Sequence, residues 1–298
     1  MPAPFPVLPS LPANRPWRLG TTSYVYADDI LPNVERLAGR AEDIELVLFE
    51  SGASANLPSP AVLARLDELR RAHAFTFTVH FPIDRQFGHA DPGHRREILR
   101  QMLRIVDAVR PLEPHAYIVH PEGLGRDAAP ARLAAWQRDM SAGLAQLVAH
   151  GLSPRLLAVE NLDFPFDWCA PFIEEADLSV CIDVGHLWRY GVDVPSHLRR
   201  WLPRTRVVHL HGECAGRDHL SLAATDQARL AACVRLLSAA PATPAASLRT
   251  RGADGWRTDE AAAQPPTAGL LFGGVVTLEM FSFEDTASSI DVLRELLS

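Results

Sequence analysis

The sequence of 298 residues contains no lysine, so arginine provides all 29 of its Lys and Arg side chains. This absence excludes any mechanism built on a lysine Schiff base or a lysine general base. The formal net charge is -7, whereas a protein that follows the phosphate backbone of a nucleic acid needs a clustered basic face. The composition therefore argues against a nucleic acid partner.

Cysteine and long apolar runs are also scarce. The four cysteines, with no C-x-x-C pair among them, are Cys169, Cys181, Cys214 and Cys233. Their scatter argues against a disulfide frame and favours small buried hydrophobes in a reducing compartment. No apolar run is long enough to span a bilayer, and residues 1–16 read as an irregular, proline-broken leader that is not a signal peptide. We expect a cytoplasmic protein with no membrane partner.

Short apolar runs alternate with amphipathic segments along the rest of the chain. Helical spacing is seen in segments such as PAVLARLDELRRA from Pro60 and REILRQMLRIVDAVR from Arg96. The apolar runs predict eight strands, at residues 17–22, 44–50, 75–80, 116–120, 156–161, 178–183, 206–211 and 274–280. Eight strands that alternate with helices predict an α/β fold, a (β/α)8 TIM barrel in one domain over residues 17–298. An open doubly wound sheet is the alternative, but no G-x-G-x-x-G turn follows the first strand.

One segment breaks this alternation. Residues 239–269 are rich in Ala, Pro and Gly and have no apolar period. They predict a flexible insert before the last strand.

Polar and ionisable residues lie at or just after the ends of six of the predicted strands. They are His80, His120, Glu160 with Asn161, Asp183 with His186, His209 with His211, and Glu279. The carboxyl ends of barrel strands meet at one edge, so these side chains should converge. Imidazoles and carboxylates gathered in this way would desolvate and repel one another without a bound cation. The pattern therefore predicts a site for divalent metal ions, and we expect zinc or manganese.

The order of these residues resembles the apurinic-endonuclease branch of the xylose-isomerase-like TIM-barrel superfamily, over roughly residues 17–298 apart from the insert. The resemblance implies one ion on His80, His120 and Glu160. It implies a second ion, whose ligands are Glu160, Asp183, His209 and Glu279. A third ion is implied on His186 and His219. At the acid position of that third site this chain has Arg217, with Asp218 adjacent.

The text GTTSYVYADDILPNVERLAGRAEDIELVLFE, followed by NLPSP and TVHFPID, resembles the cobamide-remodelling enzymes called CbiR. This resemblance implies a phosphodiesterase that cleaves the nucleotide-loop phosphoester of a cobamide, a small-molecule substrate, into a corrinoid phosphate and an α-riboside. Water activated by metal attacks phosphorus in such a mechanism, with Glu160, Asp183 and Glu279 as the catalytic residues. The residues predicted to contact the substrate are His211, Arg217, Asn161, Tyr24 and Trp188.

Two other functions fit the same residues. Glu160, Asp183, His209 and Glu279 are also the ligand set of a single-metal sugar isomerase or epimerase of this superfamily, in which a glutamate pair moves a proton. In that case His80, His120 and His186 contact the substrate. A non-catalytic barrel that binds a corrinoid or a sugar is the other possibility. Metal content, together with activity on a phosphodiester, separates the three.

Overall fold

The computed structural model describes residues 6–13, 15–49, 55–239 and 272–298. Within these ranges, eight parallel strands close into a barrel in the spatial order β1, β10, β7, β6, β5, β4, β3, β2. Their bounds are β1 (Arg18–Thr22), β2 (Asp43–Val47), β3 (Thr76–His80), β4 (Ala116–Val119), β5 (Leu157–Glu160), β6 (Ser179–Asp183), β7 (Thr205–Leu210) and β10 (Val275–Leu278). Every predicted apolar run overlaps one of these strands, although β2 and β7 each begin one residue earlier than predicted, and the predicted (β/α)8 barrel is confirmed.

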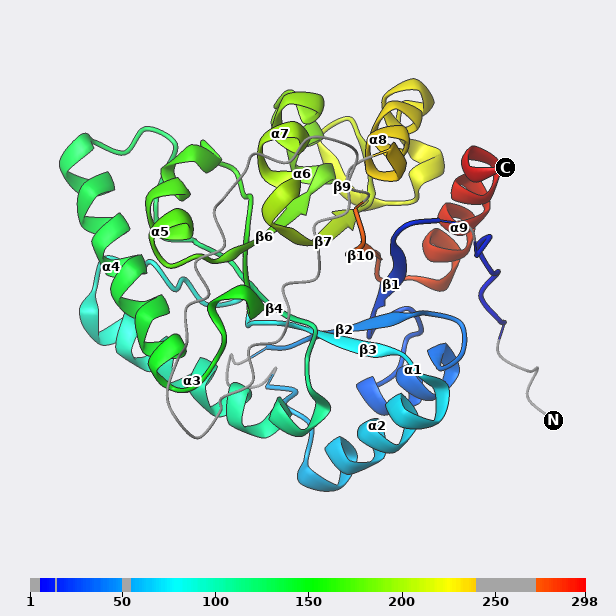
Figure 1. The fold of residues 1–298 in the computed structure, drawn as a ribbon, viewed down its shortest axis with the longest axis horizontal. Helices are drawn as coiled ribbons and strands as arrows, with labels where there is room; N and C mark the ends of the chain where they lie inside the picture. Colours follow the sequence, from blue (N-terminus) through cyan, green and yellow to red (C-terminus); the bar gives the residue numbers. More distant parts are fainter. Residues whose placement is uncertain (1–5, 14, 50–54, 240–271) are drawn as a thin grey trace, which may run out of the picture.

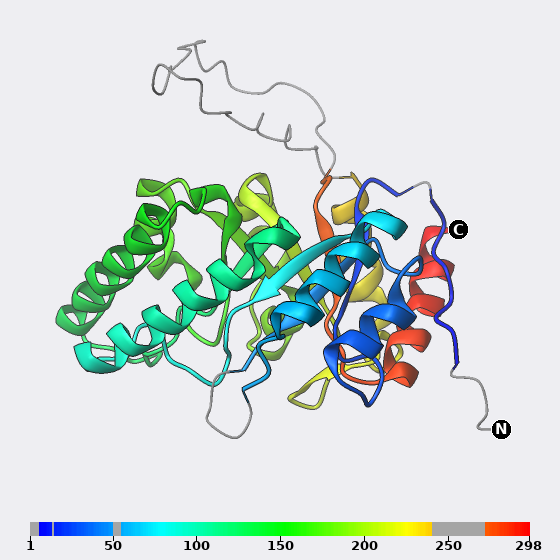
Figure 2. The same ribbon diagram turned by 90° about the horizontal axis from the view of Figure 1, so that it is seen from below.

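Helices surround the barrel on its outside (Figures 1 and 2). They are α1 (Ile30–Leu37), α2 (Pro60–His73), α3 (Pro92–Val109), α4 (Pro130–Ala149), α5 (Ala170–Glu175), α6 (Val184–Arg189), α7 (Val194–Trp201), α8 (Gln227–Ala239) and α9 (Phe283–Leu297). Helices α2, α3 and α4 begin with proline, whose missing N–H costs nothing in the first turn. Ser59 and Asp91 cap α2 and α3 through their side chains. Local sequence therefore determines where these helices start.

Side chains alternate between the inside and the outside of the barrel. A small hydrophobic cluster fills the interior and consists of Ala116, Ile118, Ala158, Cys181, Val207 and Val275. Their sequence neighbours, such as Tyr117, Val159 and Val208, belong to the large core between strands and helices. Polar residues that continue the interior alternation, such as Glu160 after Ala158, therefore lie above this apolar floor at the edge where the strands end.

A hairpin that the sequence patterns did not predict follows β7. It consists of β8 (Gly212–Cys214) and β9 (Arg217–Leu220), paired antiparallel. Its turn contains Ala215 and Gly216, whose φ angles are 53° and 77°. The hairpin brings His219 back to the edge of the barrel where β7 ends.

The predicted insert lies, from residue 240 onwards, outside the described residues. It is attached at Ala239, the end of α8, and at Phe272, just before β10. Both attachment points belong to the edge where the strands begin, opposite the edge that carries the polar cluster.

The described part of the predicted leader packs against the barrel domain. Leu8 is buried, and the guanidinium of Arg294 in α9 donates to the carbonyl oxygen of Ser10. Over the described ranges, no helix combines the length and apolar character needed to cross a membrane.

Candidate metal centre

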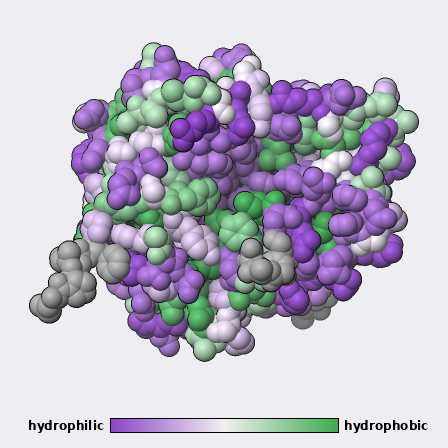
Figure 3. Space-filling model, turned by 180° about the vertical axis from the view of Figure 1, so that it is seen from behind, coloured by the Kyte–Doolittle hydropathy of each residue, from purple (hydrophilic) through white to green (hydrophobic). Residues whose placement is uncertain are grey.

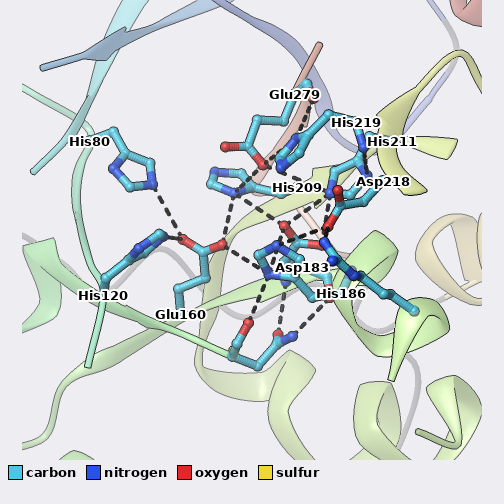
Figure 4. Close-up of polar contacts among 12 residues, drawn as sticks. His80, His120, Glu160, Asp183, His186, His209, His211, Asp218, His219 and Glu279 are labelled. Carbon is cyan, nitrogen blue, oxygen red and sulfur yellow. Dashed lines mark hydrogen bonds and ion pairs between the residues drawn. The ribbon is translucent and has the colours of Figure 1, made fainter. Parts of the chain in front are cut away.

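Glu160, the last residue of β5, lies at the centre of the polar cluster. Its Oε2 atom is 3.4 Å from His80 Nε2 and 3.0 Å from His120 Nε2. Its Oε1 atom is 3.4 Å from His209 Nδ1 and 3.7 Å from His186 Nδ1. Figure 4 shows this carboxylate between the two groups of histidines. The two oxygens of one side chain thus face two different sets of nitrogen donors.

The second set also contains two further carboxylates. His209 Nδ1 is 3.2 Å from Glu279 Oε2 and 4.0 Å from Asp183 Oδ2. Glu160, Asp183, His209 and Glu279 each place a ligand atom within 4.8 Å of the others, and all four are buried. Three strands and the residue after a fourth supply these groups, so the barrel itself sets their spacing.

The D-V-G-H stretch forms a compact unit at the end of β6. Asp183 caps α6, because its Oδ1 accepts a hydrogen bond of 2.7 Å from the backbone N–H of His186. The turn brings His186 Nδ1 to 3.3 Å from Asp183 Oδ2. A Cβ on Gly185 would lie 2.0 Å from Cε1 of His211. Glycine is therefore needed there for the His211 ring to fit.

A third group of candidate ligands consists of His186, His211 and His219. The His211 and His219 rings stack with centroids 4.1 Å apart, and the N–H of His219 donates to His211 Nδ1 at 2.9 Å. His219 has a φ of 52°, a strained backbone for a residue other than glycine. Asp218 Oδ2 is 3.9 Å from His186 Nε2 and forms an ion pair with Arg189. His211, predicted as a substrate contact, thus lies among candidate metal ligands.

Of the other predicted substrate residues, Asn161 contacts the cluster directly. The amide of Asn161 bonds both the N–H and the carbonyl oxygen of Asp183, at 2.8 and 2.9 Å. Tyr24 and Trp188 pack against the hydrophobic core, and Arg217 is exposed at the start of β9. Asn161 therefore positions Asp183, and Tyr24 and Trp188 contribute to packing. Contact of these residues with a substrate stays a prediction.

The sequence patterns missed Glu45, which lies in the middle of β2 and is fully buried. Its Oε2 is 2.9 Å from His209 Nε2, so the other ring nitrogen, Nδ1, faces Glu160 and Glu279. A carboxylate on the outer nitrogen of a metal-binding histidine fixes the ring and its tautomer. The sequence signal that could have identified Glu45 was its charge within the apolar run IELVLFE.

Burial and neighbouring charges shift the pKa values of groups in the cluster in opposite directions. Burial lowers the pKa of His120, but Glu160 and Glu122 raise it to about 10. Burial likewise opposes the effect of Asp183 on His211, whose pKa rises to about 9. Burial raises the pKa of Glu160, yet His120 and His209 hold it well below its ordinary value. Without an ion, protons on the histidines balance the carboxylates.

Several polar atoms of the cluster have no hydrogen-bond partner among the described residues. They are buried and comprise His80 Nε2, Glu160 Oε1, His209 Nδ1 and Glu279 Oε2. A buried polar atom left without a partner is costly, and native structures rarely keep several together. Imidazole nitrogens and carboxylate oxygens are the donors that zinc and manganese accept. The residues present therefore fit divalent cations.

The charge balance predicts how stability depends on pH. The folded pKa values of His120 and His211, about 10 and about 9, exceed the ordinary 6.5. In metal-free protein the stabilisation from these protons is complete below about pH 6.5 and is lost as pH rises through the folded pKa values. Bound ions replace the protons, so the metal-loaded protein should not lose stability over this range. We expect the Tm difference between loaded and metal-free protein, measured by calorimetry, to widen with rising pH. A constant difference would contradict the protonation scheme.

Glu45→Gln should weaken metal binding with little change in the fold. The amide keeps the size of the side chain but removes the charge that orients and polarises His209. We expect the affinity for zinc to fall by about 10–100-fold, as for other partners of ligating histidines. Calorimetric titration measures this, with Glu68→Gln on the exposed surface of α2 as the control. Equal affinities in the two variants would show that Glu45 does not support the site.

The fold and the cluster define a TIM barrel with a candidate metal centre at the carboxyl edge of its strands. Residues 38–243, more than half of the chain, match the family described as xylose isomerase-like TIM barrel. The chain belongs to this family. No curated protein matches it.

Solved structures show the same architecture. A D-tagatose 3-epimerase-like protein has a TM-score of 0.67 at 16% identity, covering 94% of this chain and 97% of its own. Endonuclease IV from Thermus thermophilus has a TM-score of 0.65 at 18% identity, covering 94% and 98%. A 3-keto-D-glucoside 4-epimerase from E. coli has a TM-score of 0.60 at 14% identity, covering 94% and 99%. At these identities the likeness concerns the fold alone.

Proposed function

We propose that the protein is a metal-dependent hydrolase that cleaves a phosphoester. The main support for this proposal is the position of Glu160. Its Oε2 atom faces His80 and His120, and its Oε1 atom faces His209. One carboxylate placed in this way is suited to bridge two ions. Two adjacent divalent ions would neutralise the charge of a phosphoester and lower the pKa of the attacking water.

The residues divide between the two ion positions. His80 and His120 would hold one ion, and Glu160 would be shared. The second ion would have the further ligands Asp183, His209 and Glu279. Asn161 holds the backbone of Asp183 in place, and Glu45 orients His209. Zinc and manganese both suit these nitrogen and oxygen donors.

A cavity beside the cluster offers room for an organic substrate. Its volume is about 730 Å³, within the range of small-molecule sites, and the segments that follow β3, β4, β5 and β6 line it. His120 and His186 form the part of its wall that adjoins the candidate metal centre. Hydrophilic residues surround a hollow on this face of the molecule (Figure 3). A phosphoester bound at the ions could place one of its substituents in this cavity.

We propose a cobamide as the substrate, on the resemblance of residues 20–50 and the following NLPSP and TVHFPID stretches. The nucleotide-loop phosphate of a cobamide is an accessible diester, and its cleavage would give a corrinoid phosphate and an α-riboside. Chromatography of a reaction with a complete cobamide and added zinc or manganese tests this. No corrinoid phosphate in either metal would overturn the substrate assignment.

Metal stoichiometry tests the centre independently of substrate. Elemental analysis of protein purified without chelator should give at least two divalent ions per chain. A stoichiometry of one would instead support a single-metal sugar epimerase, which is favoured by the compact set of Glu160, Asp183, His209 and Glu279. Bound metal without turnover of either a cobamide or a keto-sugar would leave a non-catalytic binding barrel.

A further inference from the structure

Cys181 lies directly beside the candidate metal centre. It is an interior residue of β6, two positions before Asp183, and is fully buried. In the sheet, its register partner on β5 is Glu160. The thiol therefore belongs to the apolar floor of the barrel, at the level where the floor meets the polar cluster.

The thiol is close enough to share an ion with two ligands of the centre. A ligand atom of Glu160, a ring nitrogen of His209 and the Sγ of Cys181 lie within 4.8 Å of one another. Glu160 Oε1 and His209 Nδ1 are both buried and without a hydrogen-bond partner among the described residues. Three unlike donors, one of them sulfur, thus lie close together in the buried interior.

Two other buried cysteines provide a contrast. Cys169 and Cys233 belong to the large hydrophobic core outside the barrel, where they act as small apolar side chains. Cys181 has the same burial, but it faces a carboxylate and an imidazole. Cys181 thus belongs to the apolar floor and also lies next to two possible metal ligands.

We propose that Cys181 is a ligand of the ion held by Glu160 and His209. Binding forms a metal–sulfur bond and releases the thiol proton to solvent, with no change in oxidation state. A sulfur ligand shifts preference towards zinc, cobalt and cadmium and away from manganese and magnesium. The inference rests on the metal centre of the proposed function but not on its substrate.

Cobalt spectroscopy tests the sulfur ligand directly. Metal-free protein loaded with Co²⁺ should show a thiolate-to-cobalt charge-transfer band in the near ultraviolet in addition to its visible d–d bands. The band should disappear in Cys181→Ser and Cys181→Ala and persist in Cys169→Ala. The preference for zinc over manganese, from competition titrations, should fall by at least about tenfold in Cys181→Ser.

A measurement on the unmodified protein covers the case in which the variants fail to fold. The cadmium NMR shift of the loaded protein separates a ligand set that contains sulfur from one of nitrogen and oxygen only. Bound cobalt with d–d bands but no charge-transfer band, or a cadmium shift typical of nitrogen and oxygen, would overturn the thiolate ligand and leave the metal centre intact. Failure to take up any divalent ion would overturn the centre itself.

Discussion

Glu160→Gln is expected to abolish turnover while the barrel stays folded. A neutral amide cannot bridge two cations as a carboxylate does, so both ion positions lose a ligand. The loss in kcat/KM should exceed the roughly 100-fold effect of losing an outer partner of a metal ligand. Metal content should fall in the same variant. The amide has the size of the carboxyl group and leaves no cavity, so circular dichroism should report an unchanged fold.

Glu122→Gln is the matched control for this variant. Glu122 Oε1 is 3.3 Å from His120 Nδ1, so it touches a candidate ligand without belonging to either set around Glu160. Its replacement should cost less than Glu160→Gln and should leave the metal stoichiometry unchanged. Near-normal activity of Glu160→Gln, or an equal loss in both variants, would show that Glu160 does not bridge ions.

The barrel could be predicted because parallel strands buried on both faces have a simple signature. Runs such as FTFTVH and LSVCID are short, apolar and followed by amphipathic helices, and each forms a strand of the barrel. The β8–β9 hairpin was missed because its strands are short and carry polar residues such as Glu213 and Arg217. Its turn depends on positive φ angles at Ala215 and Gly216. An alanine in the sequence does not indicate a positive φ angle.

The sequence predicted those residues of the candidate site that lie at strand ends. His80, Glu160 and Asp183 end apolar runs, so their convergence follows from the topology of a barrel. Glu45 and Cys181 lie inside strands, and only the closed barrel shows that their side chains face the cluster. The place of His211 among the candidate ligands depends on the glycine at position 185 and on the hairpin. These contacts form only when the chain is folded, and strand patterns do not contain them.

His120→Ala separates the two candidate enzymatic functions. Under the hydrolase proposal, His120 is a ligand of the first ion, and its loss should remove one ion per chain. Hydrolysis should then fall by at least about 100-fold, more than loss of an outer partner would cause. The second ion should stay bound, because Asp183, His209 and Glu279 are unchanged. In a single-metal epimerase, His120 would only contact substrate, so the variant would keep its single ion and change mainly KM.

His120 is a better position for this test than His80, because its replacement should disturb the fold less. The side chain of His80 is 1% exposed and that of His120 is 15% exposed, so truncation of His120 disturbs packing less. His89→Ala is the matched control, because His89 lines the same cavity outside the ligand groups identified among the described residues. It should keep both ions and most of its hydrolytic rate. If His120→Ala retained two ions and normal kcat, the first ion position would be wrong, and the compact set around His209 would be left as a single-ion site.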